Sequence, residues 1–278
     1  MTPRSADRDF WAGVGERFPD LQGAASTRYY AANERRLFAE HFPPLEGLRI
    51  LKTDLWDEAK NTRILAWAGR QGARAYGVDI SEPTVRQARA AFDAGPGSQR
   101  ALRGTVGDVR DLPFRDASFD AIYSMGTIEH FDETERAVAE MARVLKPGGR
   151  AIVGVPNRHD PFLRPLFATA LQAVGLYGYG YEKSYSRRAL RRMLEGAGLD
   201  VVAETAILFI PGWLRMLDLA CHSWCRPVAA VTGTLVRPFV FLDRHVPAVR
   251  RHGYLLATVV RKPEPAAQAP PPLHFTTS

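Results

Sequence analysis

Residues 73–80 form a short apolar run that is rich in strand formers and carries one carboxylate, Asp79, near its end. Ser81 follows as a good helix N-cap, and residues 82–92 then have helical character. A carboxylate at the carboxyl end of a buried strand is costly because it must be desolvated or paired. It is well placed, however, to accept hydrogen bonds from the two hydroxyls of a ribose. The alternative is an ordinary turn aspartate that helps to cap the next helix.

The composition limits the domain organisation and the kinds of partner that the chain can have. The 278 residues, 46% of them hydrophobic, suffice for one large α/β domain with insertions or for two small domains. The net charge of +7 comes mostly from arginines scattered through alanine-rich helices, which indicates solvated helix faces or an anion-binding surface. No block of basic residues interleaved with aromatics occurs, so we expect no nucleic-acid partner.

Cys221 and Cys225 lie one helical turn apart. This spacing would strain a disulfide, and it does not provide a four-ligand zinc site. We therefore expect two reduced cysteines in a cytoplasmic protein and no metal.

Strand patterns alternate with helix patterns along the chain, which predicts a mostly parallel sheet covered on both faces. The expected strands are 48–51, 73–80, 100–109, 119–125, 150–155, 200–208 and 253–261, and the expected helices are 10–18, 27–41, 61–71, 82–92, 133–145 and the segment from Ser186 to Gly198. The fold class is therefore α/β, with a doubly wound sheet of seven strands and helical insertions.

We expect three parts: an N-terminal helical cap over residues 1–46, one domain over 47–262, and a disordered proline-rich tail over 263–278. Insertions at about 158–185 and 211–252 would act as lids. The N-terminus has no apolar core typical of a secretory signal. The longest apolar region, 226–242, is interrupted by Pro227, Arg237 and Pro238, so we expect no stable membrane insertion, although its arginine-flanked helices could rest on a membrane surface.

Several motifs follow one another at fixed separations. They are the run 107–131 (Gly-Asp-Val-Arg-Asp-Leu-Pro-Phe to Gly-Thr-Ile-Glu-His-Phe), the helix 135–144, Leu-Lys-Pro-Gly-Gly at 145–149 and Val-Pro-Asn at 155–157. In this order they resemble the class I S-adenosylmethionine-dependent methyltransferases, close to the small-molecule members. The resemblance covers about residues 48–157 well and 181–199 moderately. It implies a Rossmann-like methyltransferase fold and S-adenosylmethionine as the cofactor.

The resemblance also implies roles for single residues. Asp79 matches the ribose-binding acid, and Ile80 matches the apolar residue that packs on the adenine. Asp108 matches the acid that accepts a hydrogen bond from the adenine amino group, beside the backbone of Val109. These assignments are chemically consistent, because hydroxyl and amino groups donate hydrogen bonds that carboxylates accept. The other cofactor-binding residues that we expect are Lys52, Thr53, Asp54, Ser124 and Met125.

The first strand departs from the family pattern. The family follows this strand with an acid and a glycine-rich loop, whereas residues 51–61 here contain no glycine. Leu55 and Trp56 cannot take left-handed backbone conformations cheaply. Either the loop follows a wider path and binds the amino-acid moiety through side chains, with Asp54 at the ammonium, or cofactor binding is weakened or lost. Asp54, Asp57 and Glu58 could also simply cap the next helix.

Glu129 and His130 follow the fourth strand, where family members bring side chains near the methyl group, and they are the candidate catalytic residues. His130 would act as a general base if the acceptor is a hydroxyl or a protonated amine, or it could be a structural histidine. The aromatic insertions favour a pocket for a small apolar or aromatic acceptor, such as a natural product, a lipid-like molecule or a glycoconjugate, or they simply pack on the sheet.

We therefore predict methyl transfer to an oxygen, nitrogen or carbon of a small molecule. The alternatives are a non-catalytic homologue that has lost the cofactor, and an enzyme of the same fold that uses the cofactor for other chemistry.

Overall fold

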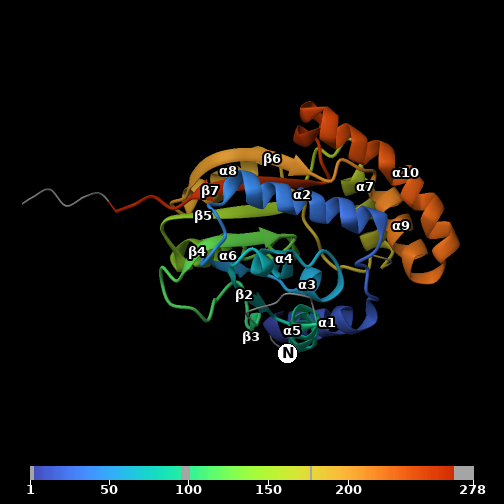
Figure 1. The fold of residues 1–278 in the computed structure, drawn as a ribbon. Coiled ribbons are helices and arrows are strands. Elements are labelled where there is room, and N and C mark those ends of the chain that lie inside the picture. The colour runs from blue at the N-terminus through green and yellow to red at the C-terminus, as the bar shows by residue number, and fades with distance from the viewer. Residues whose placement is uncertain (1–2, 95–100, 176, 266–278) are drawn as a thin grey trace, which may run out of the picture.

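The computed structural model describes residues 3–94, 101–175 and 177–265. Within them, seven strands form one sheet in the order β3-β2-β1-β4-β5-β7-β6 (Figure 1). β7 runs antiparallel between β5 and β6, and the other neighbouring pairs are parallel. The strands are β1 (Arg49–Lys52), β2 (Arg74–Asp79), β3 (Arg103–Val106), β4 (Phe119–Met125), β5 (Leu145–Pro156), β6 (Asp200–Ile207) and β7 (Leu255–Arg261). The predicted seven-stranded, mostly parallel sheet is confirmed.

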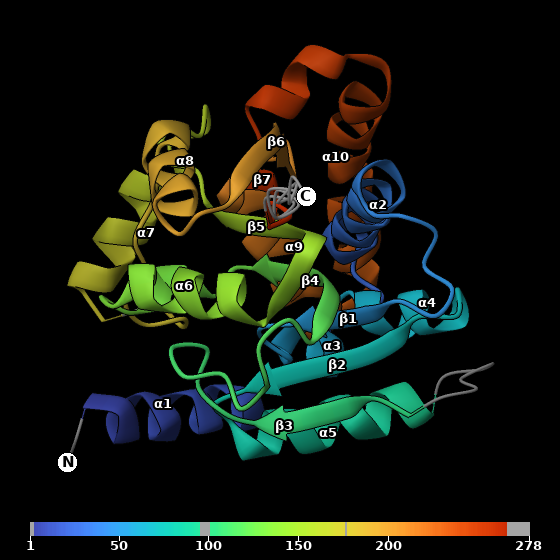
Figure 2. The same ribbon diagram turned by 90° about the vertical axis from the view of Figure 1, so that its left-hand side faces the viewer.

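Helices cover both faces of this sheet (Figure 2). One face packs on α6 and α8, and their apolar side chains share a buried cluster with Leu51, Ile122 and Val153. The other face packs on α2, α4 and α5 around Ile50 and Tyr123. The helices are α1 (Pro3–Arg17), α2 (Ala25–His41), α3 (Trp56–Lys60), α4 (Ile64–Arg70), α5 (Glu82–Asp93), η1 (Ile128–His130), α6 (Thr134–Val144), α7 (Arg164–Ala173), α8 (Arg187–Gly196), α9 (Gly212–Trp224), α10 (Arg226–His245) and η2 (Pro247–Arg251).

Local sequence explains where several helices begin. The Ser81 hydroxyl accepts a hydrogen bond from the Thr84 N–H at the start of α5, and the Ser186 hydroxyl accepts one from the Ala189 N–H at the start of α8. The predicted N-cap Ser81 is therefore confirmed, and both serines satisfy backbone donors that the first helical turn leaves without partners.

The predicted helix 61–71 is wrong in its extent. The structure divides this region into α3 and α4, separated by Arg63 in a left-handed conformation with φ 55°. The segment after β1 is also not an outlying loop. Leu55 is fully buried against Gly77 of β2, where a Cβ atom would lie 2.3 Å from Leu55 Cδ2. Leu55 itself has φ −121°, so this bulky residue needs no left-handed conformation.

The remaining segments surround this sheet. α1 begins earlier than expected and lies beside α5, whereas α2 buries Tyr30, Leu37 and Phe38 in the core next to β1. The insertion 158–185 contains α7, and the insertion 211–252 contains α9, α10 and η2. The division into a cap, a domain and a tail stays a prediction, and residues 266–278 of the expected tail lie outside the described part of the chain.

Candidate functional site

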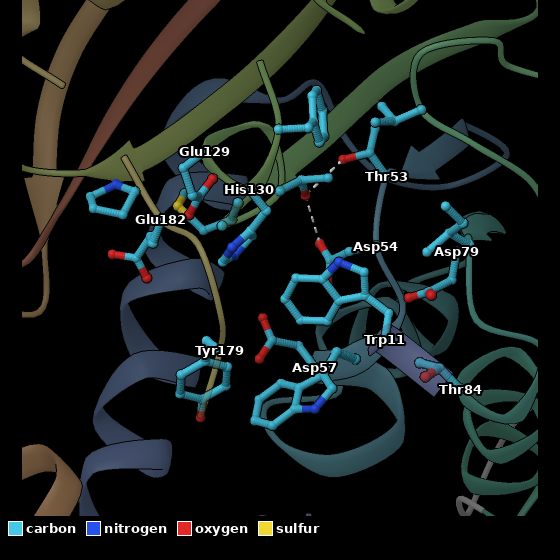
Figure 3. Close-up of a pocket in the computed structure, with 18 of the residues that line it drawn as sticks. Trp11, Thr53, Asp54, Asp57, Asp79, Thr84, Glu129, His130, Tyr179 and Glu182 are labelled. Atoms are coloured by element: carbon cyan, nitrogen blue, oxygen red, sulfur yellow. Dashed lines mark hydrogen bonds between the residues drawn. The ribbon is translucent and has the colours of Figure 1, made fainter. Parts of the chain in front are cut away.

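The strand order reverses between β1 and β4: the chain adds β2 and β3 on one side of β1 and then returns to add β4 and β5 on the other side. In open α/β sheets, ligands bind beyond the carboxyl ends of the strands at such a point. A pocket lies there (Figure 3). Its walls come from α1, from the segments after β1 to β5, and from both insertions, and they include Asp7, Trp11, Tyr30, Thr53, Asp54, Trp56, Asp57, Asp79, Ile80, Asp108, Val109, Met125, Glu129, His130, Arg164, Tyr177, Tyr179, Glu182, Arg215 and Tyr254.

Asp79 is the last residue of β2 and is held by two backbone donors. Its Oδ2 accepts a hydrogen bond from the Leu55 N–H and its Oδ1 accepts one from the Ser81 N–H, both at 2.8 Å. Burial raises the pKa of this carboxyl to about 6, against the lowering effect of the two N–H groups. A carboxylate offers about four acceptor positions, so Asp79 retains capacity for two hydroxyl donors.

A cluster of charges follows β1, with Asp54 and Asp57 in the wall of the pocket and Lys52 behind it. Lys52 Nζ is fully buried and lies 2.8 Å from Asp54 Oδ1 and 3.8 Å from Asp57 Oδ2. Burial by itself would lower the pKa of Lys52, but the carboxylates of Asp54 and Asp57 raise it overall. The second oxygen of Asp54 accepts a hydrogen bond from Thr127 Oγ1 at 3.2 Å. Asp54 is thus already paired with a cation of the protein itself, on the side where an ammonium group was expected.

Asp108 lies after β3 and is bound by Arg110. The guanidinium donates to both carboxylate oxygens at 2.8–3.0 Å, and the Arg110 backbone N–H donates to Oδ1 at 2.8 Å. Arg110 also pairs with Asp7 of α1 and with Glu133, each at 2.9 Å. An adenine amino group would therefore approach a carboxylate that already accepts several hydrogen bonds.

Glu129 and His130 lie in η1, directly after β4, on the opposite side of the pocket from Asp79 (Figure 3). Glu129 is buried, and its Oε2 has no hydrogen-bond partner among the described residues. Burial, followed by the nearby Glu182 carboxylate, raises the pKa of Glu129 well above its ordinary value. Burial lowers the pKa of His130, whose Nδ1 lies 2.8 Å from the Tyr181 carbonyl oxygen.

Residues that the sequence did not single out complete the pocket. Arg164 of α7 pairs with Glu182 at 2.6 Å, and its guanidinium lies 4.2 Å from the ring centroid of Tyr254. Arg215 of α9 lies over the rings of Tyr30 and Tyr254, and its buried Nε has no hydrogen-bond partner among the described residues. The aromatic composition of the two insertions was the available signal, but their arginines are far from the strand motifs in sequence.

The structure brings most of the expected site residues together. Those that line the pocket are Thr53, Asp54, Asp79, Ile80, Asp108, Val109, Met125, Glu129 and His130. Lys52 and Ser124 do not. Lys52 is buried in its ion cluster, and the fully buried Ser124 hydroxyl accepts a hydrogen bond from Thr53 Oγ1 at 2.7 Å. Both therefore support the pocket from behind. No group of potential metal ligands occurs among the described residues.

Comparisons with known proteins agree with this architecture. The methyltransferase domain family model matches residues 59–153. A probable S-adenosylmethionine-dependent methyltransferase of Mycolicibacterium smegmatis is 31% identical over 211 residues, which is 74% of this chain and 71% of that protein. The chain belongs to the class I S-adenosylmethionine-dependent methyltransferases.

Other relatives of this methyltransferase match shorter segments. A probable chloroplastic tocopherol O-methyltransferase of Oryza sativa is 36% identical over 86 residues, 31% of this chain and 24% of that protein. The chain spans about a quarter or less of the length of the first curated relatives that it matches. Among solved structures, magnesium protoporphyrin IX methyltransferase from Synechocystis, with bound SAH (S-adenosylhomocysteine), superposes with a TM-score of 0.59 at 14% identity, over 93% of this chain and 99% of that one.

The methyltransferase site fits S-adenosylmethionine best at its adenosine half. Asp79 is aimed into the pocket with acceptor capacity for a ribose, and Ile80 and Val109 give apolar contact beside it. The amino-acid half has no glycine loop. The side chains nearest to it, Thr53 and Asp54, are both already hydrogen-bonded to Thr127 Oγ1.

Proposed function

We propose that this methyltransferase transfers the methyl group of S-adenosylmethionine to an oxygen, nitrogen or carbon of a small aromatic or apolar molecule. The observation that carries the proposal is the shared pocket: Asp79 lies on one side of it, and Glu129 and His130 lie on the other (Figure 3). When bound, the cofactor supplies a methyl group that its sulfonium already activates. The protein must then align the acceptor and exclude water.

Aromatic side chains form the wall on the acceptor side. Tyr177 and Tyr179 pack edge to face at 5.8 Å, and Tyr179 also packs on Phe18 at the end of α1. Some polar groups among them are paired, as in the Arg164–Glu182 ion pair, whereas Nε of Arg215, Nη1 of Arg164 and Nε1 of Trp56 are buried donors without a hydrogen-bond partner among the described residues. An apolar pocket with a few placed polar groups suits a small ligand, and the free donors favour an aromatic molecule that carries oxygen.

His130 is our proposed proton acceptor. Its lowered pKa keeps the imidazole neutral near pH 7, which a base requires. If Nδ1–H donates to the Tyr181 carbonyl, Nε2 keeps its lone pair for the proton of an acceptor hydroxyl or ammonium. Burial raises the pKa of Glu129 well above its ordinary value, which favours the protonated form, and a protonated Glu129 would donate a hydrogen bond to the acceptor from its unpaired oxygen.

Calorimetry with S-adenosylhomocysteine, followed by incubation of phenols and aromatic acids with methyl-labelled S-adenosylmethionine, tests this proposal. We expect binding and a labelled product. Absence of binding at millimolar ligand would establish the non-catalytic alternative, for which the glycine-free segment is the argument. Binding of the cofactor product without methyl transfer to any aromatic compound would contradict the proposal that the acceptor is aromatic.

The same proposal includes a cytoplasmic location and no nucleic-acid partner. Both cysteines are free, and we find no block of basic and aromatic residues in the sequence. No helix in the described ranges is both long and apolar enough to cross a membrane.

A further inference from the structure

Arg215 of α9 brings a positive charge into the wall of the pocket without a partner. Its guanidinium makes no hydrogen bond or ion pair with any described residue, and its Nε is buried. A guanidinium is always charged in a protein, and it offers five N–H donors and no acceptor. A buried charge without a partner is costly, and a bound group of opposite charge offsets that cost.

The flat faces of this guanidinium lie against aromatic rings. The central carbon of the group is 5.4 Å from the ring centroid of Tyr30 and 5.5 Å from that of Tyr254. Contacts of this kind use the faces of the guanidinium and leave its N–H edge available. The two oxygens of a carboxylate match two parallel N–H groups of that edge. Arg215 is therefore placed to receive a carboxylate between aromatic side chains.

Arg164 of α7 lies against the same tyrosine and adds a free donor. Its guanidinium carbon is 4.2 Å from the ring centroid of Tyr254, and its buried Nη1 has no hydrogen-bond partner among the described residues. The charge of Arg164 is balanced, however, because its Nη2 lies 2.6 Å from Glu182 Oε1. Together the two arginines leave one positive charge unbalanced. This favours a ligand with one negative charge over a dianion such as a phosphate ester.

The carboxylates after β1 do not supply the missing charge. Asp57 also lines the pocket but makes no ion pair with Arg215. Its Oδ1 accepts a hydrogen bond from Asn61 Nδ2 at 2.7 Å, and its Oδ2 lies 3.8 Å from Lys52 Nζ. The charges of the pocket are thus divided: carboxylates follow β1, where the positively charged cofactor is expected, and the unbalanced arginine lies in an insertion.

The insertions form the side of the pocket that faces the acceptor. The Lys183 N–H donates a hydrogen bond to the Glu129 carbonyl oxygen at 3.0 Å, which holds the neighbouring Glu182 beside η1. Figure 3 shows Glu182 on the side of the pocket away from Asp79. The arginine that pairs with Glu182, and the tyrosine that both arginines share, therefore border the proposed proton acceptor His130 and not the ribose position.

We propose that the methyl acceptor is an aromatic acid whose carboxylate binds the guanidinium of Arg215 and whose hydroxyl or amino group faces His130. This inference rests on the methyl transfer proposed above and names the class of its acceptor. For a hydroxyl acceptor, the acceptor oxygen bonds to the methyl carbon while the carbon–sulfur bond breaks and sulfur keeps the electron pair. The hydroxyl proton passes to Nε2 of His130.

The test is calorimetric titration of the full chain with 4-hydroxybenzoate and 4-hydroxycinnamate, each compared with its neutral amide, with and without S-adenosylhomocysteine. We expect the acids to bind at least about tenfold more tightly than the amides, because hydrogen bonds between charged groups are the stronger kind. Arg215→Gln should weaken binding of the acids by about tenfold or more and change that of the amides less than about threefold. Arg215→Lys keeps the charge without the paired N–H groups and should lie between.

The matched control is Arg237→Gln, which removes an exposed arginine of α10 that does not line the pocket and should bind as the wild type does. If Arg215→Gln fails to fold, the comparison of acids with amides on the wild type still decides. Equal affinity for acids and amides, binding of neither acid, or wild-type affinity of Arg215→Gln for the acids would overturn the proposal.

Two further outcomes separate this inference from the methyl transfer on which it rests. A tenfold loss of S-adenosylhomocysteine affinity in Arg215→Gln would assign the guanidinium to the carboxylate of the cofactor and overturn the acid acceptor. Methyl transfer to neutral phenols with no preference for the acids would also overturn it and leave the proposed function standing. If the wild type binds the acids but no S-adenosylhomocysteine, the methyl transfer fails while Arg215 keeps its assignment.

Discussion

At the scale of single residues, Asp79 is the side chain on which cofactor binding should depend most. Replacing it with alanine leaves two ribose hydroxyls without their acceptor, and an unpaired buried group costs about 1–3 kcal/mol. We therefore expect Asp79→Ala to weaken S-adenosylhomocysteine binding by about ten- to a hundredfold, measured by calorimetry. Unchanged affinity would remove Asp79 from the site.

The same carboxyl predicts a pH dependence of binding. Its pKa is about 6 in the free protein, and hydroxyl donors bind the ionised form better, so bound ligand lowers this pKa. Affinity should be constant above about pH 7 and should fall with decreasing pH below about pH 6, approaching tenfold per pH unit. Asp79→Asn cannot titrate and should give a flat, weak profile. A wild-type profile that is equally flat would contradict the ribose contact.

His130 is the residue on which turnover should depend. His130→Ala should lower the rate of methyl transfer about 10²–10⁴-fold if it accepts the proton, and cofactor affinity should stay nearly unchanged. His159→Ala is the matched control, because His159 is an exposed histidine that does not line the pocket. A loss below about fivefold would leave His130 the structural role that its contacts with Trp11 and Tyr181 support.

At the scale of elements, the close packing of the segment after β1 on β2 replaces a glycine loop. The space for Leu55 comes from Gly77 of the neighbouring strand. We expect Gly77→Ala to lower the free energy of unfolding by about 1–3 kcal/mol, because the new methyl group meets a fully buried side chain. Urea denaturation measures this loss. Gly196→Ala, in open space at the end of α8, is the control and should be neutral or slightly stabilising.

Leu55→Ala tests whether the loss of stability in Gly77→Ala arises from contact with Leu55. Alone it should cost about 2–5 kcal/mol by leaving a cavity. Combined with Gly77→Ala it should cost less than the sum of the two, because the alanine at 77 then fills the space that Leu55 vacates. Additive losses would show that the two positions do not share one packing site.

The elements were predictable where a local pattern decides them. The strands ending at Asp79 and Met125 are apolar runs bounded by turn residues, and Ser81 and Ser186 are local caps. The break at Arg63 was not predictable from the sequence. Arginine is not a helix-breaking residue, so nothing in the sequence marks its left-handed backbone conformation. Two features of the site depend on tertiary contacts, which the periodicity of the sequence does not encode. They are the pairing of Lys52 with Asp54 and the position of Arg164 and Arg215 in the pocket wall.

At the scale of the whole molecule, the pocket is assembled from distant parts of the chain. α1 contributes Asp7, which pairs with Arg110, and Trp11, whose ring lies 4.7 Å from that of His130. α9 contributes Arg215 from the other end of the sequence. The sheet gives the position of the site, whereas the N-terminal helix and the insertions decide how far it is closed.

Helix α1 borders the pocket and should slow the release of a bound ligand. The clusters of buried apolar side chains among the described residues include no residue of α1, although its Val14 is itself fully buried. Removal of residues 1–18 should therefore keep the fold and accelerate dissociation of S-adenosylhomocysteine by about tenfold or more, since lids slow the release of ligands. Stopped-flow displacement measures the rate. Trp11→Ala, which removes one contact and keeps the helix, should lie between the wild type and the truncation. A truncated chain that stays folded and releases the ligand at the wild-type rate would mean that α1 only borders the pocket and does not close it.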